Sequence, residues 1–223
     1  MSEKIIFSAE NVNGKTGKFF DEFSLSEINF SLPEGYIMGI AGKNGSGKTT
    51  FFRYIMSRKK LYSGSFFLNG REIHDDIRST LDSVAFISED VEFLNNASAA
   101  ENAEIIGRFY SRYEKNLFEE MMKKMDLSSG MKADEMSKGQ NMRFQLALAM
   151  SHSPELILLD EPTAGMDPVF KKDFYMILKK YLDRGGCSVI MSSNLNEDIE
   201  NHFDYTGYFE NGVFTRFTEN TPV

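Results

Sequence analysis

The sequence predicts an α/β fold, because strand-like and helix-like segments follow one another around a glycine-rich loop. Residues 36–41 form a short apolar run that is typical of a buried strand, and residues 49–56 have the apolar spacing of a helix. The loop at residues 42–49 joins these two segments, and a second strand-like run occurs at residues 156–160. Strand, loop and helix in succession are typical of folds in which helices cover a sheet.

Composition and charge limit the classes of protein to which the chain can belong. With 223 residues it can bury the core of one domain, and its net charge of −8 argues against a nucleic-acid surface, which needs a basic face. No apolar run approaches the roughly 18 residues needed to cross a bilayer, and the start of the chain is too short for a signal peptide. The single cysteine, Cys187, lies in an apolar run and is expected in the core rather than as a nucleophile. We therefore expect a cytosolic protein with no nucleic-acid partner.

The loop Gly-Lys-Asn-Gly-Ser-Gly-Lys-Thr at residues 42–49 is a complete phosphate-binding motif. Its glycines permit backbone angles that turn amide N–H groups inward on phosphates. Lys48 would reach the β- and γ-phosphates, the Thr49 hydroxyl would hold Mg²⁺, and the helix start adds a positive field. Glycine-rich clusters also occur in surface turns, but this spacing between a strand and a helix favours a nucleoside triphosphate site. The expected nucleotide ligands are Gly42, Lys43, Asn44, Gly45, Ser46, Gly47, Lys48, Thr49 and Thr50.

Two carboxylates follow the apolar run at residues 156–159 and point to the chemistry of phosphate release. In the phosphate-loop class the first, Asp160, holds the Mg²⁺ shell. The second, Glu161, is placed to polarise a water molecule for attack on the γ-phosphate. Any strand can end in Asp-Glu, so this signal gains its strength from the phosphate loop.

A helical pattern at residues 141–150 is preceded by Ser137, which fits a helix N-cap. The Ser137 hydroxyl and the amides around Gly139 would form a second anion site at a helix start. A plain capped helix is the alternative reading of this segment.

Taken in order, the phosphate loop, Ser-Lys-Gly-Gln at 137–140, Asp-Glu-Pro-Thr at 160–163 and Ala-Gly-Met-Asp at 164–167 resemble the ATP-binding cassette (ABC) ATPases. The resemblance covers nearly the whole chain and implies ATP and Mg²⁺ as cofactors. It also implies that two subunits sandwich two ATP molecules. The segment that would act across this interface comprises Ser137, Lys138, Gly139 and Gln140. Asp167 would belong to the loop that links the two sites, and Phe19, or alternatively Phe20, would stack on adenine.

The resemblance also implies the layout of the fold. The core would be a P-loop NTPase sheet, mostly parallel, flanked by a small antiparallel β subdomain with a hairpin turn at Asn69-Gly70. The strands expected in the core sheet are residues 36–41, 84–87, 156–160 and 187–192. Residues 1–89 and 139–223 would form the nucleotide-binding core, and residues 90–138 an inserted helical subdomain.

Within the expected helical subdomain, Ser98-Ala-Ala-Glu101 is a capping box that opens a helix over residues 99–113. A second helix is expected over residues 116–125. In transporters of the resembled family a helix of the membrane subunit docks in a groove beside this subdomain. Five side chains would line that groove, although aromatic residues at helical spacing are more often core: Phe93, Leu94, Phe109, Tyr110 and Tyr113.

Two positions depart from the pattern of the resembled family. Glu89 stands where a glutamine usually contacts Mg²⁺ and the attacking water. Glu89 would still bind Mg²⁺ or the water, but it adds a negative charge that glutamine does not carry. Asn194 stands where most members have a histidine that bonds the γ-phosphate, and asparagine cannot become cationic. We therefore hypothesise that hydrolysis is slow or depends on a partner that supplies an intact site, since removing one stabilising donor costs about 3–4 kcal/mol of transition-state stabilisation.

The function that these features favour is the ATP-binding and hydrolysing subunit of a membrane transporter, with ATP-driven dimer closure powering a separate transmembrane subunit. The Ser-Lys-Gly segment at 137–139 is most like that of bacterial exporters, so we expect an exporter subunit held peripherally at the inner face of the membrane. The pair would be a homodimer or a heterodimer with a second ATPase. The alternatives are a soluble ATPase switch of the same family, such as one serving iron–sulfur assembly, and a binding module that closes on ATP without useful turnover.

Overall fold

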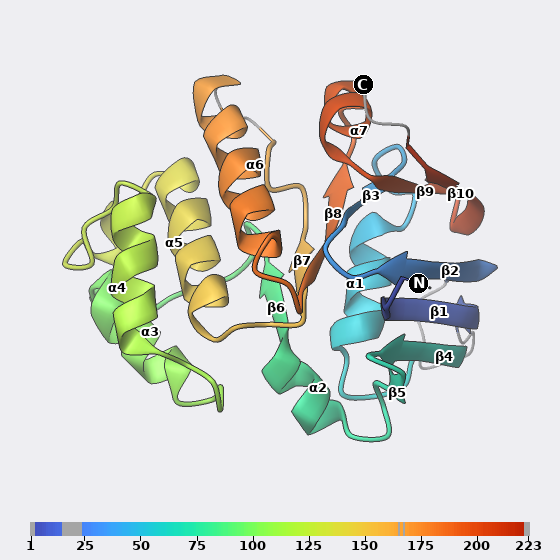
Figure 1. Ribbon diagram of the computed structural model, residues 1–223, viewed down its shortest axis with the longest axis horizontal. Helices are drawn as coiled ribbons and strands as arrows, with labels where there is room; N and C mark the ends of the chain where they lie inside the picture. Colours follow the sequence, from blue (N-terminus) through green and yellow to red (C-terminus); the bar gives the residue numbers. More distant parts are fainter. Residues whose placement is uncertain (1–2, 15–23, 165, 167, 221–223) are drawn as a thin grey trace.

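Two β-sheets and a set of helices make up the computed structural model, which describes residues 3–14, 24–164, 166 and 168–220 (Figure 1). In the described part of the chain, one sheet has four strands in the order β2-β1-β4-β5, and the other has six in the order β10-β9-β3-β8-β7-β6. Helices α4, α5 and α6 lie on the side of the six-stranded sheet away from the smaller one. The α/β class predicted from the sequence is confirmed.

The centre of the six-stranded sheet is parallel and fully buried. Its central strands β3 (Ile37–Ala41), β7 (Leu156–Leu159) and β8 (Ser188–Ser193) are buried at every position, which explains why each is built from apolar and small residues. The strand β6 (Val84–Ile87) pairs with β7 in parallel, and its Ile87 lies opposite Leu159. The carboxyl ends of all four predicted strands therefore meet at one edge of the sheet.

The outer strands β9 (Tyr205–Glu210) and β10 (Val213–Glu219) were not predicted from the sequence. β9 pairs with β3 in parallel, and β10 closes this side of the sheet in antiparallel orientation. The short helix α7 (Asn196–His202) leads from β8 into β9.

The smaller sheet is antiparallel and packs on the first helix. It contains β1 (Ile5–Gly14), β2 (Ile28–Pro33), β4 (Tyr62–Leu68) and β5 (Arg71–Glu72). Helix α1 (Lys48–Met56) buries Phe51 and Phe52 in a core shared with both sheets. Asn69 and Gly70 have φ angles of 48° and 73°, as the predicted hairpin turn requires.

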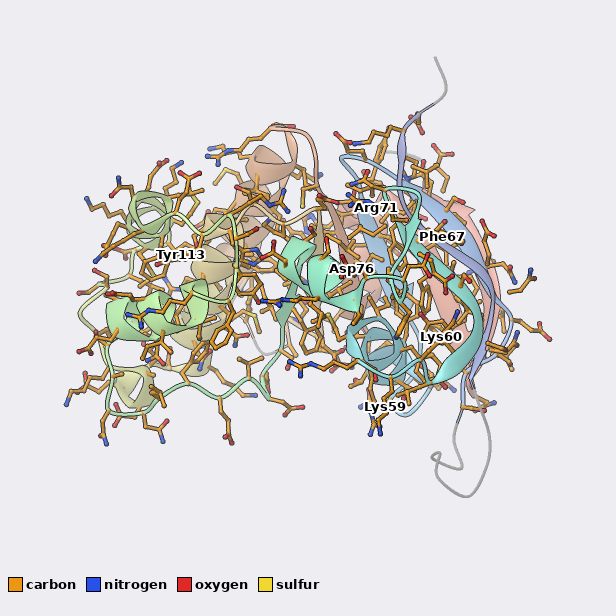
Figure 2. All side chains as sticks on the ribbon, turned by 90° about the horizontal axis from the view of Figure 1, so that it is seen from below. Lys59, Lys60, Phe67, Arg71, Asp76 and Tyr113 are labelled. Atoms are coloured by element: carbon orange, nitrogen blue, oxygen red, sulfur yellow. The ribbon has the colours of Figure 1, made fainter. Side chains whose placement is uncertain are left out.

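One side of the molecule presents the segments that follow α1 and β4 (Figure 2). Lys59 and Lys60 follow the end of α1, Phe67 and Arg71 belong to the β4–β5 hairpin, and Asp76 caps α2 (Ile77–Ser83). Three contacts of the residue before β7, Glu155, hold this side together. Its side chain accepts a hydrogen bond from Asn69 at 2.6 Å, its amide donates to the Ser83 carbonyl at 2.8 Å, and its carboxylate lies 3.7 Å from Arg112.

Four helices form the layer beside β6, β7 and β8. They are α3 (Ala99–Gly107), α4 (Lys115–Lys124), α5 (Lys138–Ser151) and α6 (Pro168–Leu182), with a 3₁₀ turn at Ala133–Glu135 before α5. Phe118 of α4, Phe144 of α5 and Phe174 of α6 share one core cluster with the sheet. No described helix is long and apolar enough to cross a membrane.

The prediction of one helix over residues 99–113 is wrong at its C-terminal end. The capping box at Ser98 is present as predicted, but the helix ends at Gly107. After it the chain turns back, and the ring of Tyr113 packs directly on Gly107, where a Cβ atom would lie 2.4 Å from the ring. The helix stops because Gly107 provides the space for this turn. The helix predicted at 116–125 is observed one residue earlier at each end.

Candidate active site

Loops from three strand ends and the start of α5 line a pocket of about 650 Å³. Its walls are the phosphate loop after β3, residues 88–90 after β6, the carboxylates after β7, and Lys138. Of the expected nucleotide ligands, six line this pocket: Asn44, Gly45, Gly47, Lys48, Thr49 and Thr50. Gly42, Lys43 and Ser46 instead line a neighbouring pocket of about 420 Å³ beside the end of β9. Phe19, Phe20 and Asp167 lie outside the described residues.

The phosphate loop depends on glycine at its two ends. Gly47 precedes α1 with a φ of 116°, a conformation that side chains rarely adopt. At Gly42 an added Cβ would lie 2.4 Å from the Ser46 hydroxyl and 2.6 Å from the carbonyl oxygen of Phe209. These contacts explain why the loop between β3 and α1 can turn so tightly.

Lys48 is a buried cation with its charge already partnered. Its side chain is 5% exposed, and its ammonium donates to the Gly42 carbonyl at 2.9 Å. It also lies 3.1 Å from Oε1 of Glu161. A buried ammonium needs such partners, because desolvation of an unpaired charge is costly. The predicted phosphate-binding lysine and the predicted base are thus in direct contact.

Asp160 is held by hydroxyl groups from two different elements. Thr49 Oγ1 donates to Asp160 Oδ2 at 2.7 Å, and Ser192 Oγ donates to Oδ1 at 2.6 Å. Ser192 also accepts a hydrogen bond from the Glu161 amide at 2.8 Å, where Glu161 has a φ of 47°. Ser192 was not predicted from the sequence, although its place at the end of a strand beside β7 is a usable signal. Hydroxyl and carboxylate oxygens are the ligands that Mg²⁺ prefers, so Thr49 and Asp160 fit the ion.

The start of α5 is a complete capping box. Ser137 Oγ accepts from the Gln140 amide at 3.3 Å, and Gln140 Oε1 accepts from the Ser137 amide at 2.9 Å. The predicted N-cap is confirmed. Of the four residues in the 137–140 segment, Lys138 lines the pocket, and its ammonium lies 2.5 Å from Glu89 Oε2.

Asn194 lies next to the phosphate loop, where its amide donates to Asn44 Oδ1 at 3.5 Å. The preceding residue is anchored to a buried carboxylate, because Ser193 Oγ donates to Asp198 Oδ2 at 2.7 Å. Thr163, just after the Glu161 turn, donates to the same oxygen at 2.8 Å.

The buried carboxylate of Asp198 also has an ionic partner, Lys171 of α6, whose ammonium lies 2.6 Å from Asp198 Oδ1. Burial alone would raise the pKa of Asp198, but the Lys171 ammonium and the hydroxyls of Ser193 and Thr163 hold it below its ordinary value. This network was not predicted from the sequence, because its members are ordinary helix and loop residues brought together by the fold. Through Ser193 and Thr163, the network connects the loop that contains Asn194 to the turn after Glu161.

Of the five residues expected to line a docking groove, two line one small cavity and the other three lie outside it. Phe93 packs on Phe144 with ring centroids 4.7 Å apart, and Tyr110 stacks on His152 at 3.8 Å. Both line a small cavity of about 100 Å³ beside β6. Tyr113 packs on Gly107, while Leu94 and Phe109 are 56% and 80% exposed.

Two further residues that can carry chemistry, Cys187 and His152, lie away from the pocket. Cys187 is buried and burial raises its pKa to about 12, so it is a core residue as predicted. His152 is also buried, which lowers its pKa to about 4. In the described part of the chain no group of three or more His, Cys, Asp or Glu side chains is placed to hold a metal ion.

The family profile described as ABC transporter matches residues 25–164. The chain belongs to the ABC transporter family. Among similar proteins, it is 30% identical over 206 residues to an uncharacterized ABC transporter ATP-binding protein, YdbJ, of Bacillus subtilis (strain 168). It is 29% identical over 199 residues to the bacitracin transport ATP-binding protein BcrA of Bacillus licheniformis. These alignments cover 92% and 88% of this chain but 66% and 65% of the relatives, so the chain spans just under two thirds of their length.

A relative of more similar length is the lantibiotic transport ATP-binding protein SrtF of Streptococcus pyogenes, which is 27% identical over 84% of this chain and 81% of its own. Solved ABC cassettes share the fold. An ATP-binding subunit of an ABC transporter superposes with a TM-score of 0.85 at 18% identity, over 96% of this chain and 90% of its own. A dimeric cassette in a post-hydrolysis state with ADP and Pi has a TM-score of 0.82 at 22% identity, over 98% and 100%.

Proposed function

We propose that this ABC protein is the ATP-binding and hydrolysing subunit of a membrane exporter. The observation that carries the proposal is the meeting of Lys48, Thr49, Asp160 and Glu161 in one pocket at the carboxyl edge of the sheet. Family membership and the names of the relatives BcrA and SrtF, which refer to bacitracin and lantibiotic transport, support the exporter assignment.

The contact between Lys48 and Glu161 suggests the order of events in the pocket. A γ-phosphate on the loop would replace Glu161 as the partner of Lys48, since a phosphate carries more charge than a carboxylate. Glu161 would then be free to accept a proton from the attacking water. Asn194 would donate a hydrogen bond near the γ-phosphate, in keeping with its place beside Asn44.

Thr49 and Asp160 would hold Mg²⁺ together with the phosphates, whereas the carboxylate of Glu89 at the pocket wall is paired with Lys138. The ion, when bound, would neutralise charge on the phosphates. The hydrogen bond from Ser192 fixes the carboxylate of Asp160 in the orientation that points its other oxygen at Thr49.

The 137–140 segment and Asp167 would act between two cassettes, and Phe19 would stack on adenine. ATP-driven closure of the dimer would power a separate transmembrane protein. This partner would dock near the cavity lined by Phe93 and Tyr110. The chain would then be held at the cytoplasmic face of the membrane by this partner.

The first test is phosphate release by the purified chain in the presence of ATP with and without Mg²⁺. The proposal expects turnover that depends on Mg²⁺ and on an intact Lys48. If ATP bound with no release of phosphate under any condition, the binding-module alternative would replace the hydrolysing subunit.

A further inference from the structure

The nucleotide pocket has more acidic than basic groups along its walls. Among the described residues, four carboxylates line it, those of Glu89, Asp90, Asp160 and Glu161, against two ammonium groups, those of Lys48 and Lys138. ATP brings several further negative charges into this pocket. Each carboxylate near the phosphates therefore needs a partner, or it will weaken nucleotide binding.

The two cations are divided between two of the acids. Lys48 lies 3.1 Å from Glu161, and Lys138 lies 2.5 Å from Glu89. Asp160 is satisfied by the hydroxyls of Thr49 and Ser192. If ATP takes Lys48 from Glu161, Lys138 remains the cation that offsets Glu89.

The backbone next to Glu89 is fixed by helix α5. Gln145 is 5% exposed, accepts from the Ser88 amide at 3.2 Å and donates to the Ser88 carbonyl at 2.9 Å. Its amide also donates to Asn141 Oδ1 at 2.8 Å. Lys138, Asn141 and Gln145 are spaced by three and four residues, so they share one face of α5. This face holds both the Ser88 backbone and the Glu89 carboxylate.

We infer that Lys138 is a positioning residue of the nucleotide site, which acts through Glu89. Its ammonium neutralises the Glu89 carboxylate and holds it against the start of α5, so that the pocket accepts a triphosphate despite its acidic wall. The inference rests on ATP binding at the phosphate loop. The side chains are 76% and 41% exposed, so the pair itself adds little to folding stability.

The test is the affinity of the full chain for ATP, with Mg²⁺ and with EDTA, in Lys138→Gln, Glu89→Gln and the double variant. Lys138→Gln is expected to raise the Kd for ATP by about three- to tenfold, because it leaves Glu89 unpaired near the phosphates. Glu89→Gln is expected to tighten binding, and the double variant to match Glu89→Gln. The difference in Kd between Lys138→Gln and the unaltered chain should shrink at about 1 M salt, where the Debye length is roughly 3 Å.

Three outcomes would overturn the inference. The first is an equal loss from Lys138→Gln in the Glu89→Gln background, which would mean that Lys138 contacts the nucleotide directly. The second is no loss from Lys138→Gln, and the third is weaker Mg²⁺-ATP binding in Glu89→Gln, which would make Glu89 a metal ligand instead. If the unaltered chain bound no ATP, the proposed function itself would fail.

Charge-exchanged and control variants separate this role from a general structural one. Lys138→Arg and the exchanged pair Glu89→Lys/Lys138→Glu are expected to recover most of the affinity lost in Lys138→Gln. The control is the pair Glu120–Lys124 on α4, which is 2.6 Å apart, about half exposed and outside the pocket. Lys124→Gln should leave ATP affinity unchanged. If the exchanged pair Glu89→Lys/Lys138→Glu did not recover the ATP affinity that is lost in Lys138→Gln, a charge effect would be contradicted.

Discussion

At the scale of single residues, the site is a set of charges that neutralise one another until nucleotide arrives. Lys48 is buried against Glu161, and Asp160 is oriented by Thr49 and Ser192. The phosphate loop and the two carboxylates were predicted from their sequence spacing, because the chemistry fixes residue types at fixed offsets. The contacts of Ser192 with Asp160 and of Lys138 with Glu89 were not predicted, since they join segments far apart in the chain.

Replacing Glu161 by glutamine removes the proposed base while keeping the size of the side chain. We expect ATP turnover to fall by about 10²- to 10⁴-fold, the usual contribution of a general base. ATP binding should persist, because Lys48 would lose a competing carboxylate. Phosphate release and nucleotide affinity measured on the same preparation check both parts. Turnover within twofold of the unaltered chain would remove Glu161 from the mechanism.

Asn194 sets a second expectation at this scale. A histidine at this position would add a donor that can carry positive charge near the γ-phosphate. Asn194→His should therefore raise turnover, by up to about 10²-fold if this donor limits the reaction. Steady-state phosphate release at saturating ATP measures the change, with Asn194→Gln as the uncharged control. An unchanged rate would show that Asn194 does not slow hydrolysis.

At the scale of elements, the fold places the site by joining strand ends to helices through a few polar ties. The buried strands were predicted from apolar runs, and the starts of α3 and α5 from their capping boxes. The end of α3 was not predicted correctly, because it depends on the packing of Tyr113 on Gly107, which is a tertiary contact. β9 and β10 were missed because polar residues and a glycine interrupt their apolar residues, so neither strand is a continuous apolar run.

The ion pair between Asp198 and Lys171 joins α7 to α6 and should be a main source of stability near the site. Asp198→Asn is expected to lower the free energy of unfolding by about 3 kcal/mol, because it removes the buried carboxylate and leaves the largely buried Lys171 ammonium with only the exposed Glu197 as an ionic partner. Glu197 also lies 3.1 Å from Lys171 but is 71% exposed, so Glu197→Gln should cost less than about 1 kcal/mol. Urea unfolding of the three proteins at pH 7 tests the contrast, and equal losses would contradict it.

The same pair predicts a pH dependence. The folded pKa of Asp198 lies below its ordinary value, so its contribution is fully present above the unfolded carboxyl pKa of about 3.9. It is lost as pH falls from there through the lower folded pKa. Between pH 7 and pH 3 the unaltered chain should lose more stability than Asp198→Asn, and parallel curves would argue against the pair.

The turn after α3 gives a further prediction for an element. Gly107→Ala places a methyl group 2.4 Å from the Tyr113 ring, and we expect it to cost about 1–3 kcal/mol through overpacking. Gly130 is the matched control, since a Cβ there meets only the Ser128 hydroxyl at 3.7 Å. Gly107→Ala should have a clearly lower midpoint of thermal unfolding than Gly130→Ala. Equal midpoints would show that the turn accommodates the added methyl group without overpacking.

At the scale of the whole molecule, the sheet edge, the start of α5 and the helical layer meet around one pocket. The division into a core of residues 1–89 and 139–223 and a helical subdomain of residues 90–138 stays a prediction. So do the contributions of Phe19 and Asp167, and the choice between a homodimer and a heterodimer. These depend on a second cassette and on a membrane partner, whose identity the residues of one chain do not encode.

The exporter assignment is best tested by affinity purification of this chain from its native cell, in mild detergent with ATP. We expect a protein with several membrane spans to co-purify in a stoichiometric amount. The same purification would reveal any second ATPase in the complex. Recovery of the chain as ATP-closed dimers with only soluble partners would contradict the exporter assignment and favour a soluble switch.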